Sequence, residues 1–211
     1  MSSRPNPSRR VISPRAYQFI LGLDHLNSQL LPEGPFGSPY EILDYQATLV
    51  LTDPRGRRAI FHRTQQIRFL QDGVRAILDH AWGDGVTLTN YRNTAGPIGE
   101  SFKDEGVRHL MIGLARPARR GDVLAFEVER AAMAGFTADD EWLETTIDHP
   151  IHRLGQWIVF PRERPCEEAE LCVDGEIFPI RPGATGDGRT MIRIQIERPR
   201  ANTSYTIRWR W

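Results

Sequence analysis

The stretch "TMIRIQIERPRANTSYTIRWRW", residues 190–211, contains two runs in which apolar and polar side chains alternate one by one. Successive side chains of a strand point to opposite faces, so the pattern predicts two adjacent antiparallel strands with an apolar inner face and a polar outer face. Base stacking on nucleic acid would need aromatic rings on the solvent face beside the cations. The aromatic and basic residues occupy alternate positions and therefore face opposite sides of the strand, which favours strands of the core. The apolar parity of the second run holds Tyr205, Ile207, Trp209 and Trp211.

The same period of two extends towards the amino terminus as far as Tyr40. The turn signals "DPRG" (53–56) and "RPARRG" (116–121) each lie between two alternating runs, and each predicts a hairpin. About nine short strands, most of them separated by glycine- and proline-rich turns, are typical of a sandwich. The sequence therefore predicts an all-β fold, an antiparallel β-sandwich of immunoglobulin-like or jelly-roll kind, over residues 40–211.

The residues before this region have a different character. Residues 1–12 combine serine, proline and arginine, which predicts a disordered basic arm. Ser13 as a cap and Pro14 as the first helical residue precede apolar side chains at spacings of three and four. This pattern predicts an N-terminal helix followed by a linker, together spanning residues 13–39.

The charge balance argues against nucleic acid and membranes as partners. Lys+Arg and Asp+Glu both number 27, so the formal net charge is zero and gives no global attraction to anionic surfaces. No run approaches the ~18 apolar residues that cross a bilayer. The two cysteines, Cys166 and Cys172, match no zinc-ligand spacing, and we expect them to be reduced. Together these features predict a cytoplasmic protein without a cofactor. The near-exclusive use of arginine over lysine is typical of a GC-rich bacterium.

An acidic segment spans residues 140–152, with Asp139 directly before it, and holds two groups of candidate residues. No lysine or arginine occurs between residues 131 and 148, so the carboxylates form a patch that suits a basic partner. Alternatively, carboxylates and imidazoles in this segment would hold a divalent metal in a hydrolytic enzyme. Pro150 argues against this, because it forbids the helical geometry that would aim both histidines at one ion. The partner-binding candidates are Asp139, Asp140, Glu141 and Glu144, and the metal candidates are Asp148, His149 and His152.

A basic patch lies around the first predicted hairpin, because residues 54–71 contain arginines and no acid. Arg55, Arg57 and Arg58 crowd its tip and are further partner-binding candidates. Together with the basic arm they suggest a third possibility, binding to a phosphate backbone, but solvated surface is the better explanation for cations at a hairpin tip. The chain has no G-x-S-x-G nucleophile elbow and no cysteine-protease signature, so we identify no catalytic residue.

One glycine-rich stretch, "GATGDGRT" (183–190), has the spacing of a phosphate-binding loop. Arg189 stands where that loop has lysine, and an alternating run follows in place of a helix. No helix N-terminus would then face a phosphate. We therefore expect a turn between two strands.

The segments "WIVFPRERP" (157–165) and "YTIRWRW" (205–211) carry a resemblance. They resemble the carboxy-terminal half of an uncharacterised bacterial β-sandwich module that accompanies effectors of conflict and signalling systems. The resemblance covers residues 105–211. It implies an accessory role and no catalytic residues. We therefore expect a non-enzymatic sensor or adaptor that binds another protein and presents two separate patches of opposite charge.

Overall fold

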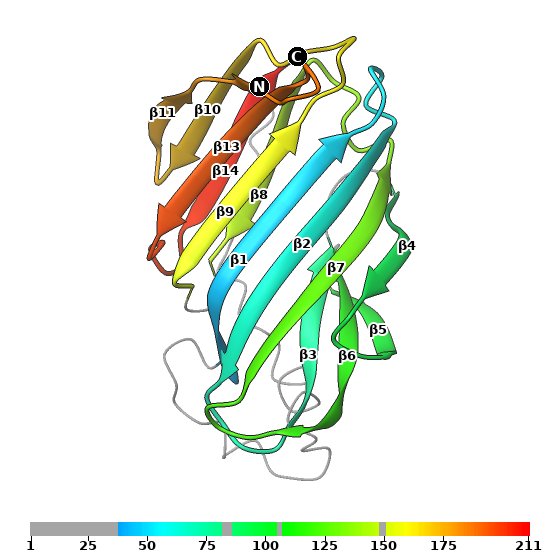
Figure 1. Cartoon of the computed structure of the whole chain (residues 1–211), viewed down its shortest axis with the longest axis vertical. Helices are drawn as coiled ribbons and strands as arrows, with labels where there is room; N and C mark the ends of the chain where they lie inside the picture. Colours follow the sequence, from blue (N-terminus) through cyan, green and yellow to red (C-terminus); the bar gives the residue numbers. More distant parts are fainter. Residues whose placement is uncertain (1–37, 82–85, 105–106, 148–150) are drawn as a thin grey trace.

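The computed structural model describes residues 38–81, 86–104, 107–147 and 151–211. These residues form fourteen strands and no helix, and the strands build three sheets (Figure 1). The largest sheet has seven strands in the order β12-β13-β9-β1-β2-β7-β4. The second has four in the order β11-β10-β14-β8, and the third has three in the order β3-β6-β5.

The strands have the following bounds. They are β1 Tyr40–Leu51, β2 Arg58–Phe69, β3 Val74–Ala81, β4 Val86–Asn93, β5 Ile98–Asp104, β6 Val107–Ala118, β7 Val123–Met133, β8 Asp140–Thr146, β9 Arg153–Val159, β10 Glu168–Val173, β11 Glu176–Ile180, β12 Gly183–Ala184, β13 Thr190–Glu197 and β14 Ser204–Arg210.

Both smaller sheets pack against the same face of the seven-stranded sheet. Strand β2 shows this face well, because every second residue from Ala59 to Phe69 is buried. The burial produces two apolar clusters, one under the four-stranded sheet and one that reaches from the three-stranded sheet to Val173 and Tyr205 of the four-stranded sheet. The cluster under the four-stranded sheet includes Leu49, Ile158, Ile192, Ile207 and Trp209. The cluster under the three-stranded sheet includes Ile67, Val128, Ile77 and Ile112.

The two terminal strands, predicted to pair with each other, lie in different sheets. β13 pairs with β9 in the seven-stranded sheet, and β14 lies between β8 and β10 in the four-stranded sheet. Residues 198–203 connect them, so their apolar faces meet across the core instead of side by side. The predicted parity itself is confirmed, since Trp209 and Trp211 are only 3% and 5% exposed. Arg208 and Arg210 face the solvent.

Two further differences concern strand pairing. The turn at 116–121 does not form a hairpin, because β6 belongs to the three-stranded sheet and β7 pairs with β2 and β4. In addition, β1 pairs with β9 in parallel, from Tyr45 with Leu154 to Val50 with Val159. An all-β chain of packed sheets is thus confirmed. Its pairing is not wholly antiparallel, and three sheets replace the two of an immunoglobulin-like or jelly-roll sandwich.

Some predictions concern residues that the structure does not describe. The basic arm of 1–12 lies wholly outside the described residues. The same is true of the helix and linker of 13–39, apart from Ser38 and Pro39, which lead into β1. Over the described part of the chain, no helix has the length and apolar character that spanning a bilayer requires.

Candidate functional site

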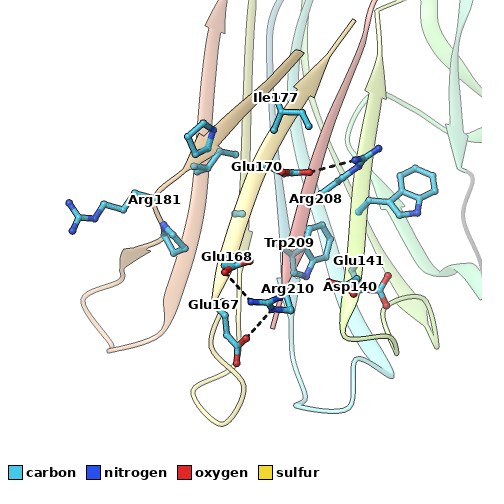
Figure 2. A pocket seen from close by; sticks show the side chains of 15 residues that line it. Asp140, Glu141, Glu167, Glu168, Glu170, Ile177, Arg181, Arg208, Trp209 and Arg210 are labelled. Atoms are coloured by element: carbon cyan, nitrogen blue, oxygen red, sulfur yellow. Dashed lines mark hydrogen bonds and ion pairs between the residues drawn. The ribbon is translucent and has the colours of Figure 1, made fainter. Parts of the chain in front are cut away.

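The outer face of the four-stranded sheet carries a block of charged side chains (Figure 2). Glu168 and Glu170 of β10 stand opposite Arg210 and Arg208 of β14 in the strand register. Strict alternation produces this block, because the residues between them, such as Trp209, point into the core. The face therefore presents a column of carboxylates beside a column of guanidiniums.

Ion pairs connect these two columns. Arg210 places Nε 3.2 Å from Oε2 of Glu167 and Nη2 3.0 Å from Oε1 of Glu168. Arg208 Nη1 lies 3.5 Å from Oε1 of Glu170. The hydrogen bond to Glu167 and the charge of Glu168 raise the pKa of Arg210 above its ordinary value. Exposed ion pairs of this kind contribute little to stability, so an incoming charged group can replace them at little cost.

A depression of about 890 Å³ lies over this block. Its lining contains five carboxylates and three guanidiniums, a formal surplus of two negative charges. The carboxylates belong to Asp140, Glu141, Glu167, Glu168 and Glu170, and the guanidiniums to Arg181, Arg208 and Arg210.

Exposed apolar side chains flank the charged block on both sides. Ile177 of the edge strand β11 is 58% exposed, and Trp142 of β8 is 38% exposed. Pro179 of β11 pairs in register with Glu170, and Trp142 pairs in register with Arg208. One line across the four strands therefore reads apolar, acidic, basic, apolar. We call this line, made of Pro179, Glu170, Arg208 and Trp142, the central rung.

The structure brings the predicted acidic candidates to this sheet. Asp140 and Glu141 line the depression. Glu144 lies further along β8, where Oε2 accepts a hydrogen bond from Thr206 at 3.2 Å. Asp139 precedes β8 and accepts a 2.6 Å bond from Arg164. The acids of β10 were not among the predicted candidates, although the alternation in "EEAELCV" (167–173) places them on one face of a strand.

The predicted basic tip lies at the end of the β1–β2 hairpin, which the structure confirms. The carboxylate of Asp53 organises it by accepting the main-chain N–H groups of Arg55 and Arg58 at 2.9 and 2.7 Å. Gly56, with φ of 63°, allows close contact with the loop before β8, where Phe136 N–H donates to Gly56 O at 3.2 Å. The tip and the acidic segment are therefore neighbours at one end of the molecule, not separate patches.

Arg164 joins these segments, a role that no sequence pattern indicated. Its guanidinium donates to the main-chain oxygens of Trp211 (3.0 Å), Pro54 (3.3 Å) and Ala138 (3.1 Å), and to Asp139. It also stacks 4.1 Å from the centre of a Trp211 ring. We call this arrangement the Arg164 clamp, because it ties the hairpin tip, the loop before β8 and the end of β14 together.

The metal candidates are only partly described. His152 Nε2 lies 3.0 Å from Oε2 of Glu41, whose other oxygen pairs with Arg68 at 3.0 Å. Asp148 and His149 lie outside the described residues. Where the chain is described, no three or more histidine, cysteine, aspartate or glutamate side chains are grouped to hold a metal ion. The structure thus places His152 in a surface hydrogen bond with Glu41.

A buried ion pair lies between the seven-stranded and three-stranded sheets. Arg63 Nη1 is 2.8 Å from Oδ1 of Asp79, and the hydroxyl of Tyr91 donates to Oδ2 at 2.8 Å. Burial and the charge of Asp79 raise the pKa of Tyr91. Burial lowers the pKa of Arg63, but Asp79 more than offsets this, so the pKa is raised overall. Both groups therefore stay protonated, and the ion pair links β3 to the large sheet.

The stretch at 183–190 forms a turn between β12 and β13, as expected. Thr185 N–H donates to Arg189 O at 2.8 Å, and Gly188 N–H donates to Thr185 O at 3.0 Å. The Arg189 side chain pairs with Asp187 at 2.8 Å. These contacts lie within the stretch, which serves as the connection between the two strands.

Comparison with known proteins identifies a fold but no family. No protein-family model matches the chain, and no curated protein matches it. An M1 zinc metallopeptidase from Deinococcus radiodurans shares 10% identity over 81% of this chain and 42% of its own, with a TM-score of 0.48. A candidate protease from Parabacteroides distasonis shares 8% identity over 82% of this chain and 40% of its own, with a TM-score of 0.52. The chain thus spans about two fifths of the length of these proteins, and the second likeness shows a shared fold alone.

Proposed function

We propose that the protein is a non-enzymatic protein-binding module, a sensor or adaptor, and that its partner docks on the outer face of the four-stranded sheet. The observation that carries this proposal is the combination of exposed Ile177 and Trp142 with the acidic depression between them. Protein interfaces combine apolar anchors with a polar surround, and aromatic residues are enriched among the anchors. The resemblance of residues 105–211 supports an accessory role beside a bacterial effector or signalling component.

Charge supports a partner with a basic surface. The depression has a surplus of carboxylates, and complementary potentials favour encounter with the opposite charge. The whole chain is neutral, so this attraction for basic groups is local to the face.

The test compares two triple variants as bait in an extract of the source organism. The first reverses Asp140, Glu141 and Glu144 to lysine on the proposed face. The second reverses Glu127, Glu129 and Glu197, three exposed acids on the opposite face of the seven-stranded sheet, which we call its uncovered face because no described strand packs on it. We expect the proteins that the wild type captures to be lost with the first variant and kept with the second. Equal capture by both variants would contradict the proposal.

A further inference from the structure

Pro179 removes one main-chain donor from the edge of the four-stranded sheet at β11. The two-residue turn Asp174–Gly175, with φ of 50° and 85°, pairs Val173 with Glu176 and fixes the register of the hairpin. Hydrogen-bonded pairs alternate along an antiparallel ladder, so Ile177 and Pro179 direct their main-chain groups away from β10. Pro179 has no N–H to offer there, a common protection of edge strands. Strand addition at β11 is thereby weakened, and we place the partner segment over the face of the sheet.

The central rung defines what such a segment needs. Pro179 and Trp142 stand three strands apart, which is about 14 Å at the usual strand spacing of about 4.8 Å. In an extended chain, side chains at positions i, i+2 and i+4 share one face, and i to i+4 spans about 13 Å. Two apolar side chains four positions apart would therefore reach both apolar ends of the rung at once.

Glu170 and Arg208, in the middle of the central rung, determine which charge is favoured at position i+2 of the partner segment, between its two apolar side chains. Glu170 lies beside Glu168, and Arg208 holds Glu170 only through a 3.5 Å exposed pair. The depression contains five carboxylates and three guanidiniums, so an added cation is attracted to it and an added anion is repelled.

We infer that the occupant is an extended segment of a partner protein with the pattern apolar-x-basic-x-apolar, lying across the four strands along the central rung. This inference rests on the proposed function and adds the chemistry of the partner. The basic side chain contacts Glu168 and Glu170, and the apolar side chains contact the Ile177–Pro179 end and Trp142.

Three synthetic nine-residue peptides test it against the isotope-labelled full chain by NMR titration. Their central residues are Val-Ser-Lys-Ser-Val, Val-Ser-Glu-Ser-Val and Ser-Ser-Lys-Ser-Ser. We expect the first peptide to shift the amide signals of Glu170, Arg208 and Trp142 and to bind roughly tenfold more tightly than either of the others, a difference of about 1.4 kcal/mol. Glu170→Gln should weaken the first peptide severalfold, whereas Glu127→Gln on the opposite face should leave it unchanged.

Four results would overturn the inference: equal or tighter binding of the glutamate peptide, shifts elsewhere on the protein, no binding of any peptide at millimolar concentration, or self-association that Trp142→Ser abolishes. Any of the first three, together with partner capture that depends on Asp140, Glu141 and Glu144, would reject the inference and leave the proposed function standing. If partner capture is unchanged when Asp140, Glu141 and Glu144 are reversed to lysine, the proposed function itself is rejected.

Discussion

Replacing Arg164 with alanine removes the clamp that joins three distant segments. Its side chain is only 19% exposed, and it makes three hydrogen bonds to main-chain oxygens and one ion pair with Asp139. A hydrogen bond contributes about 0.5–1.5 kcal/mol net, and more when the donor is charged, and a ring contact adds about 0.5–1 kcal/mol. Water can replace part of these bonds at the surface, so we expect a loss of about 3 kcal/mol in the free energy of unfolding.

Urea unfolding followed by tryptophan fluorescence measures this loss. Arg164→Lys keeps the charge but loses the planar fork, so we expect about half of the effect. Arg208→Ala is the matched control, because its exposed 3.5 Å pair should cost less than about 1 kcal/mol. An Arg164→Ala variant within about 0.5 kcal/mol of the wild type would refute the clamp.

Three other predictions concern the interior and the uncovered sheet face. Gly155→Ala should cost about 1–3 kcal/mol in thermal unfolding, because its Cβ would lie 2.6 Å from the ring of Trp157. Asp79→Asn should cost about 3–5 kcal/mol in urea unfolding, because it leaves Arg63 buried without its counter-charge. Burial and the charge of neighbouring Glu167 raise the pKa of the Cys166 thiol from its ordinary 9 to about 11, so its contribution to stability is full below pH 9 and is lost as the pH rises towards 11. Between pH 8 and pH 11 the free energy of unfolding of Cys166→Ser should therefore fall less than that of the wild type. The same pH dependence in both proteins would refute this prediction.

The alternation of apolar and polar residues predicted correctly which side of a strand each residue faces, but it did not predict which strands lie next to each other. It placed Trp209 inside and Arg208 outside correctly, because the parity of a strand fixes which side each residue takes. It wrongly paired the last two strands, because parity contains no information about which strand lies alongside. The turn at 53–56 was predicted correctly because proline and glycine positions determine such turns locally.

The candidate site could be predicted only in part, for a similar reason. Asp140 and Glu141 were found from local charge, and they do line the depression. The clamp at Arg164 was missed because Pro54, Ala138 and Trp211 approach it from sequence distances that no local pattern encodes.

Photo-crosslinking tests the docking face most directly. A benzophenone amino acid replaces Ile177 on the proposed face in one variant and Val123 on the uncovered face of the seven-stranded sheet in the other. Both positions are exposed aliphatic residues, at 58% and 51%, so the two variants are matched. We predict that irradiation in an extract of the source organism yields a discrete crosslinked protein from position 177 and none from position 123. Crosslinking of the same protein from position 123 alone, or from neither position while capture persists, would contradict the account.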